Sequence, residues 1–236
     1  WVVFYTEIDS IKVKIKRGSS FDFIILRNGK DSCCTRIVSS KSIKNSTIPS
    51  ENRSDTIPFT LNQFDAIHVK GIINSTDTIN LHFDIGTLDF RLTRETLSRY
   101  KSQRINQLKL GSLVWNLPNI QTANQASHGM DGRFGWRVFD EKIIEIDYDN
   151  KFIVIHNTLP KKMKGFKKSK IKFIQSLFCI KSTIELDNKK YTGDFLFDTG
   201  SDLTMVIHPT WMKNQEFPNT LEVVKNAFEN NSQVTI

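Results

Sequence analysis

An internal repeat constrains the fold of this 236-residue chain more than any other feature of its sequence. An Ile-Pro-Phe tripeptide begins at Ile57, and a related Ile-Lys-Phe begins at Ile171, 114 residues later. An Asp-Ile-Gly-Thr tetrapeptide begins at Asp84, and a related Asp-Thr-Gly-Ser begins at Asp198, again 114 residues later. Because two landmarks share one offset, we expect two copies of one structural unit.

The segments around these landmarks have the pattern of β-strands. In each copy an apolar stretch, a polar turn and a second apolar stretch lead to the Asp tetrapeptide. Near the N-terminus, apolar residues alternate with lysines over 11–16, and an Asn-Gly pair at 28–29 follows the apolar run 21–26, as in a tight hairpin. We therefore predict an all-β protein, in which the return strand of this hairpin lies near 35–38.

Shifts in composition divide the chain into four parts. We assign residues 1–56 to an N-terminal extension of β-strands, 57–160 to the first copy of the repeat, 161–170 to a lysine-rich linker and 171–236 to the start of the second copy. The first copy closes with Asp-Gly-Arg-Phe-Gly at 131–135 and two further strand patterns. Because the shared offset puts the equivalent closing element beyond the end of the sequence, we expect the second copy to be incomplete.

The composition argues against several other classes of protein. Apolar residues make up 39% of the chain, which is too many for a disordered polypeptide. No apolar run reaches the roughly 18 residues of a membrane-spanning helix. The net charge is +8, but six lysines concentrate in 161–170, where a solvated linker and a functional basic patch are the alternatives. We expect no nucleic-acid partner, because no aromatic residue apart from Phe166 is interleaved with these lysines, as a stacking surface would require.

The start of the chain lacks both an initiating Met and the pattern of a signal peptide. We therefore expect the sequence to be an excerpt of a longer protein. Any contact with a membrane is expected only through an anchor outside this sequence.

The cysteines and histidines do not form a metal-site or disulfide pattern. Cys33, Cys34 and Cys179 are an odd number without framework spacing, and we expect them to be buried as small apolar side chains. The five histidines have no ligand spacing with cysteines or carboxylates. We therefore predict no metal ion and no cofactor.

Two aspartates at equivalent strand ends can act as a catalytic pair. Two carboxyl groups that share a proton do not easily ionise together, so one serves as the base while the other remains the acid. The charged carboxylate can activate a water molecule, and the protonated one can polarise a carbonyl group. Asp84 and Asp198 are thus the candidate catalytic residues. The alternative is that each is a turn residue whose carboxylate accepts backbone N–H bonds.

These motifs resemble those of the retropepsin and pepsin-like aspartic proteases, particularly bacterial two-lobed relatives. The resemblance covers roughly residues 57–215 and rests on the two Asp loops and on Arg-Phe-Gly at 133–135, which matches the element that crosses behind the first loop. It implies two tandem retropepsin-like, acid-protease β-barrel lobes, the second of them incomplete. It also implies an aspartic endopeptidase, a peptide or protein substrate, and an exported or cell-envelope location.

The resemblance assigns roles to neighbouring residues as well. Thr199 would reach across to the backbone of the other lobe, while Thr87 and Ser201 would hydrogen-bond the outer carboxylate oxygens. The hairpin at 110–116 would be the flap that covers the substrate, with Trp115 contacting a bound peptide; the alternative role of this Trp is packing. The supporting residues implied are Gly86, Thr87, Thr199, Gly200 and Ser201, and the flap residues are Gly111, Ser112 and Trp115.

Two departures from the family pattern leave other functions open. Ile85 has no hydroxyl where the family has Thr, and Arg133 replaces an apolar residue. Ile85 permits a catalytically silent, protease-like module that binds peptides or proteins. A further alternative is a plain two-domain β protein of the envelope that binds partners through its basic face, in which Asp84 and Asp198 would lie far apart.

Overall fold

The protein is described by a computed structural model in which most residues of the described chain lie in β-strands, as the strand patterns predict. The described residues are 1–6, 8–16, 18–27, 29, 31–39, 54–101, 104–123, 129–160, 165–174, 176–201, 203, 205–218, 226–229 and 232–235. Residues 40–53 of the N-terminal extension and residues 161–164 of the lysine-rich linker lie outside these residues. The described linker residues 165–170 are exposed.

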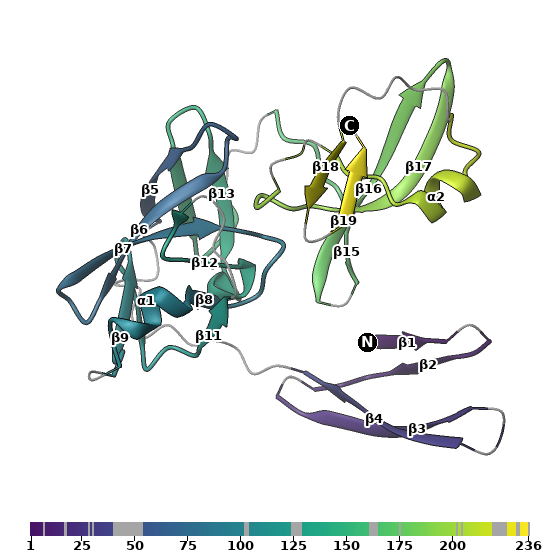
Figure 1. The fold of residues 1–236 in the computed structure, drawn as a ribbon, viewed down its shortest axis with the longest axis horizontal. Coiled ribbons are helices and arrows are strands. Elements are labelled where there is room, and N and C mark those ends of the chain that lie inside the picture. Colours follow the sequence, from purple (N-terminus) through teal and green to yellow (C-terminus); the bar gives the residue numbers. More distant parts are fainter. Residues whose placement is uncertain are drawn as a thin grey trace.

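Ten strands between residues 55 and 156 form one sheet, called here the central sheet (Figure 1). The spatial order is β11-β8-β12-β7-β6-β5-β14-β13, and β9 joins it by pairing with both β6 and β10. The strands are β5 Asp55–Leu61, β6 Ile67–Ile73, β7 Asp77–Phe83, β8 Phe90–Thr93, β9 Gln107–Leu110, β10 Leu113–Asn116, β11 Ile120–Ala123, β12 Gly132–Phe134, β13 Ile143–Asp147 and β14 Phe152–His156. The helix α1 (Arg94–Ser98) and the 3-10 helix η2 (Trp136–Phe139) follow β8 and β12.

Apolar side chains on one face of the central sheet form its core. They include Leu81, Phe83, Phe90 and Phe134, each at most 1% exposed. The rings of Phe83 and Phe134 stack with centroids 5.0 Å apart, because their strands run side by side in register. This core fixes the ends of β7 and β12, where candidate site residues lie.

The strand β12 lies between β7 and β8, parallel to the first and antiparallel to the second. Gly132 and Gly135 make this insertion possible: an added Cβ would overlap the carbonyl oxygen of Arg91 in one case and of Thr87 in the other. The N–H of Asp84 donates to the Phe134 carbonyl at 3.0 Å. The Arg-Phe-Gly element therefore lies directly behind the Asp84 loop.

The C-terminal segment, residues 171–235, forms separate small sheets beside the central sheet (Figure 1). Three strands pair as β15 (Ile171–Ile174), β16 (Leu177–Leu186) and β17 (Lys189–Leu196), the helix α2 spans Pro209–Asn214, and β18 (Asn226–Glu229) pairs with β19 (Ser232–Thr235). Trp211 of α2 packs on Phe195 with ring centroids 5.5 Å apart. Among its described side chains only Cys179 and Tyr191 are buried hydrophobics, so this segment has a much thinner core than the central sheet.

Equivalent turns in the two copies lie where the sequence predicts polar turns. The β6–β7 turn holds Asn74 and Ser75 at φ values of 50° and 65°, and the β16–β17 turn holds Asp187 and Asn188 at 50° and 62°. Asn and Asp tolerate this left-handed region better than other non-glycine residues. Both hairpins are therefore encoded locally.

The N-terminal residues form two antiparallel ribbons, β1 (Val2–Tyr5) with β2 (Ser10–Val13) and β3 (Ser20–Arg27) with β4 (Asp31–Val38). The hairpin between β3 and β4 confirms the predicted turn, with Gly29 at φ 69°, although the return strand begins at Asp31 rather than Thr35. The expectation of buried cysteines is wrong for Cys33 and Cys34, which are exposed on a ribbon that pairs with no further strand among the described residues; Cys179 is buried.

Candidate active site

The two aspartates selected by the repeat meet in the structure. Asp84 follows β7 at the edge of the core and is 5% exposed, whereas Asp198 follows the strand β17 and is exposed. The N–H of Gly86, two residues after Asp84, donates to Oδ1 of Asp198 at 3.2 Å, and the charge of Asp198 is close enough to raise the pKa of Asp84. The hypothesis of a two-domain protein with distant aspartates is therefore contradicted.

Two glycines allow this approach, and they do so reciprocally. A Cβ added to Gly86 would lie 2.6 Å from Cγ of Asp198, and one added to Gly200 would lie 2.6 Å from Cγ of Asp84. Distances this short are not found for real Cβ atoms, so any side chain at either position would displace the opposite carboxyl group. Each loop thus supplies an aspartate and the glycine that makes room for the other aspartate.

Backbone donors from both loops hold one oxygen of Asp198. Oδ1 accepts the N–H of Gly200 in its own loop at 2.8 Å and the N–H of Gly86 from the opposite loop at 3.2 Å. This oxygen is therefore fixed by atoms of both loops.

Thr199 connects the two loops through its hydroxyl group. Oγ1 accepts the Ile85 N–H at 3.1 Å and donates to the Phe83 carbonyl at 2.8 Å. The Thr199 carbonyl oxygen also lies 3.4 Å from Nε2 of His82. Ile85 does not return this contact, because its side chain is 5% exposed and belongs to the hydrophobic core. Both hydroxyl hydrogen bonds that connect the two loops are thus made by Thr199 of the C-terminal segment.

Arg133 makes a contact with Asp84 that its place in the sequence did not reveal. Its Nη1 donates to Oδ2 of Asp84 at 3.1 Å, and the arginine side chain remains 30% exposed. The interaction was missed because the contact depends on β12 lying beside β7 in parallel. The one indication of this contact in the sequence is that a charged residue, Arg133, stands directly before Phe134 and Gly135.

The environment of Asp84 favours its protonated form. Burial raises the pKa of this carboxyl group to about 6, and the nearby charge of Asp198 and the hydrogen bond to it act in the same direction. Arg133 opposes them by charge and by hydrogen bonding. The pair therefore has one buried carboxyl group suited to hold a proton and one exposed carboxylate beside it.

Thr87 and Ser201, the hydroxyl residues three positions after Asp84 and Asp198, have different surroundings. Thr87 is 8% exposed, and its N–H donates to the Asp84 carbonyl at 3.0 Å. Ser201 Oγ donates to the Leu203 carbonyl and accepts the Leu203 N–H, both at 3.2 Å. The hydroxyl of Ser201 is thus engaged within its own turn rather than with the outer oxygen of Asp198.

The contacts of the 110–116 hairpin give no support to its interpretation as a flap. Trp115 is 1% exposed and packs edge-on against Phe90, with ring centroids 5.1 Å apart. The turn is tied to the start of β5, where Ser112 N–H donates to Oδ2 of Asp55 at 3.1 Å, and a Cβ at Gly111 would lie 2.9 Å from Ile57. The hairpin is part of the central sheet because β9 pairs with β6, and Gly111 and Ser112 at its turn are exposed whereas Trp115 is buried.

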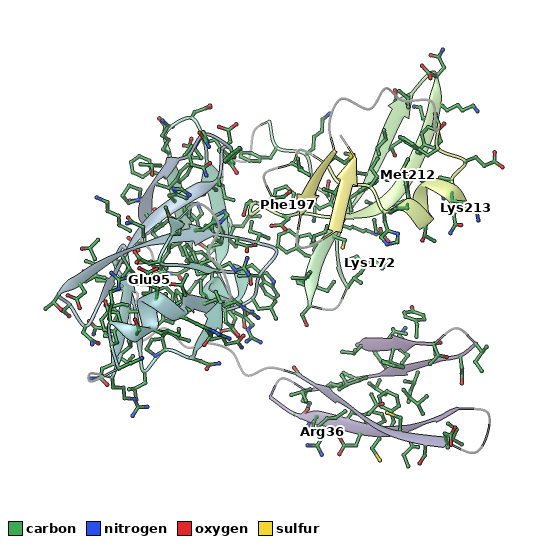
Figure 2. The ribbon with its side chains drawn as sticks, viewed as in Figure 1. Arg36, Glu95, Lys172, Phe197, Met212 and Lys213 are labelled. Carbon is green, nitrogen blue, oxygen red and sulfur yellow. The ribbon has the colours of Figure 1, made fainter. Side chains whose placement is uncertain are left out.

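Aromatic residues add a second contact between the central sheet and the C-terminal segment. Trp136 Nε1 donates to the Ser176 carbonyl at 3.2 Å, and its ring lies 5.3 Å from that of Phe173. Phe178 stacks on Phe197, which Figure 2 labels on the side of the segment facing the central sheet. The sequence pattern does not predict this contact, because Trp136 and Ser176 are 40 residues apart and share no motif.

The described residues contain no group of three or more His, Cys, Asp or Glu side chains placed to hold a metal ion. In the same part of the chain, no helix has the length and apolar character needed to cross a membrane.

Comparison with known proteins shows similarity to solved structures, with low sequence identity. No protein-family model matches the chain, and no curated protein matches it. Among solved structures, the chain is similar to the crystal structure of a retropepsin-like aspartic protease from Rickettsia conorii, with 14% identity and a TM-score of 0.35. The match covers 46% of this chain and 95% of that chain. A TM-score this low does not establish a function, and the functional evidence in this chain is the geometry of the two Asp loops.

Proposed function

We propose that this chain carries the active site of an aspartic endopeptidase, in which the central sheet and the C-terminal segment act as two lobes that each supply one aspartate. The observation that carries this proposal is the reciprocal fit of the loops: Gly86 makes room for Asp198, and Gly200 makes room for Asp84. Isolated turn aspartates have no need of such a fit. A shared-proton pair requires it, because both carboxyl groups must reach one point.

The proposed reaction uses the different surroundings of the two carboxyl groups. Asp198, exposed and held by two backbone N–H donors, is the charged base that takes a proton from a water molecule. The water oxygen bonds to the carbonyl carbon of the peptide, while Asp84 donates its proton to the carbonyl oxygen. In the second step the carbon–nitrogen bond breaks, the amine leaves with the proton held by Asp198, and Asp84 regains a proton from the diol. The products are a carboxylic acid and an amine.

A second candidate function is a catalytically silent module that binds peptides or proteins. Two observations favour it. The ion pair with Arg133 occupies Oδ2 of Asp84 and opposes the protonation that the reaction requires. Ile85 is absorbed into the core, so the two loops are braced by only one threonine hydroxyl.

Hydrolysis of an unfolded protein or a peptide library between pH 3 and 7 tests the proposal. We expect pepstatin-sensitive cleavage that is lost in both Asp84→Asn and Asp198→Asn. Asp187→Asn is the matched control, because this exposed turn aspartate has a left-handed φ of 50° that Asn also tolerates. A folded wild-type protein that binds peptides without cleaving them at any pH would instead establish the silent module.

A further inference from the structure

A row of basic side chains crosses the central sheet beside Asp84. The strand register pairs Arg91 of β8 with Arg133 of β12, Arg133 with His82 of β7, and His82 with His68 of β6. Residues paired directly across neighbouring strands point to the same face of a sheet. The rings of His68 and His82 confirm this placement, with centroids 5.9 Å apart. We call these four residues the basic row.

The basic row lies on the face opposite the aromatic core. Side chains alternate along a strand, so His82 and Arg133 point away from the core residues Phe83 and Phe134 that follow them. The row reaches the candidate active site at two points. Arg133 Nη1 lies 3.1 Å from Asp84 Oδ2, and His82 Nε2 lies 3.4 Å from the Thr199 carbonyl oxygen.

The two arginines of the row have more positive charge and more donors than the described residues satisfy. Arg91 and Arg133 stand directly opposite each other, which is unfavourable for like charges unless an anion lies between or beside them. Asp84 is the one ion-pair partner of Arg133 among the described residues, and Arg91 makes no ion pair with any of them. The Nε atoms of both arginines are buried without a hydrogen-bond partner in the described structure. A buried donor without a hydrogen-bond partner is unfavourable, so a bound acceptor would stabilise these groups.

We propose that the basic row is a specificity site that binds the carboxylate of an acidic side chain in the peptide substrate, close to the bond that is cleaved. This inference rests on the proposed protease function and names its substrate class. Arginine matches a carboxylate with paired N–H donors, and a peptide carboxylate supplies the charge that Arg91 lacks. Because Arg133 already touches the reacting carboxyl group, the bound side chain belongs to a residue next to the scissile bond.

The test compares two C-terminally amidated peptide series that carry Glu or Gln at the residues flanking the cleaved bond. Amidation removes the terminal carboxylate, so any preference reports the side chain. We expect kcat/KM to be about tenfold or more higher for the Glu peptides. In Arg91→Met and Arg133→Met, the Glu-to-Gln ratio should fall to within about twofold of unity. In Arg94→Met it should remain as in the wild type, because Arg94 is an exposed residue of α1 outside the row.

The ratio within one variant does not depend on how much of that variant is folded, so partial misfolding leaves the test intact. Equal rates for Glu and Gln peptides in an active wild-type protein would overturn the specificity site while leaving the protease function standing. If the protein does not hydrolyse peptides, fluorescence polarisation with the same peptides decides. Tighter binding of Glu peptides that is lost in Arg91→Met would support the basic row as a site for acidic side chains, although the protease function fails. Equal binding of Glu and Gln peptides would overturn this specificity site.

Discussion

The Asp84 loop and the Asp198 loop carry the same motif but are supported in different ways. Asp84 is 5% exposed, its neighbour Ile85 is part of the hydrophobic core, and β12 passes directly behind it. Asp198 is exposed and follows a three-stranded sheet with few buried side chains. Its oxygen and its neighbour Thr199 bind backbone atoms of the Asp84 loop. The first loop is therefore held by its own core, and the second is held largely by the first.

This difference shows that a repeated motif does not imply a repeated energetic role. In a symmetric pair, each threonine would brace the opposite loop. Here one hydroxyl makes both connecting hydrogen bonds, while its counterpart Ile85 contributes apolar burial instead. Variants of the two loops should consequently fail in different ways.

The largest expected effect comes from replacing the glycine of either loop. In Gly86→Ala or Gly200→Ala, the new Cβ would overlap the carboxyl group of the opposite aspartate, so the pair must separate. Because a displacement of about 1 Å can cost 100-fold in rate, we expect kcat/KM to fall at least about 100-fold in both variants. The measurement is peptide hydrolysis at the pH optimum of the wild type.

The control for the glycine variants is Gly165→Ala. A Cβ there meets no atom within 4 Å, although the φ of 93° strains the backbone locally. Its hydrolysis rate should therefore stay near that of the wild type. If Gly86→Ala and Gly200→Ala retained full activity, the reciprocal fit of the loops would not be needed for catalysis.

The second expected effect is a pH-dependent stability that belongs to the Asp84 loop. Because burial raises the pKa of Asp84 to about 6, the folded protein holds a proton that the unfolded chain releases near pH 4. The contribution is fully present below pH 4 and is lost as the pH rises through 6. At about 1.4 kcal/mol per pKa unit, it amounts to at most about 3 kcal/mol.

Urea unfolding of the wild type and Asp84→Asn at a series of pH values between 4 and 7.5 measures this contribution. The free energy of unfolding of the wild type should decrease with pH relative to that of Asp84→Asn, which has no carboxyl group to titrate at this site. Parallel curves for the two proteins would show that burial does not raise the pKa of Asp84.

A smaller effect is expected from removing the hydroxyl of Thr199. Thr199→Val keeps the side-chain shape but leaves the Ile85 N–H and the Phe83 carbonyl without their partner. We expect a loss of about 1–3 kcal/mol in the free energy of unfolding and a lower kcat, because Asp198 is no longer fixed against the central sheet. Thermal unfolding and peptide hydrolysis measure the two quantities.

The matched change in the other loop is Ile85→Thr, which restores the hydroxyl of the family pattern. Because Ile85 is packed in the core, this variant should lose about 1–2 kcal/mol of stability and gain no activity. An increase in both stability and activity would mean that the hydroxyl can cross to the Asp198 loop, and that the asymmetry of the two loops is not intrinsic.

The sequence predicted the fold class and the hairpins because these depend on local patterns. Alternating apolar residues and turn residues such as Asn74 and Asn188 act within a few positions of the chain. The sequence did not predict the exposure of Cys33 and Cys34, because burial of a strand depends on what covers it rather than on its own residues. Trp115 was assigned two possible roles for the same reason, and only the pairing of β9 with β6 reveals its buried position.

The candidate site was predictable as far as the repeat extends. The shared offset selected Asp84 and Asp198 and the glycines that follow them, because both copies preserve the same loop. The contact of Arg133 with Asp84 and the turn around Ser201 were not predictable, since they depend on side-chain positions that the repeat does not fix. The basic row required the register of four strands, which no local pattern supplies.

A titration of the aspartate carboxyl carbons by ¹³C NMR tests the central claim that Asp84 and Asp198 form one proton-sharing pair. The resonance of Asp84, assigned by its absence in Asp84→Asn, should titrate near pH 6 in the wild type. In Asp198→Asn the pKa of Asp84 should move down towards the ordinary range, because the neighbouring charge is removed. An Asp84 resonance that titrates near pH 4, or one that is unchanged by Asp198→Asn, would contradict the account.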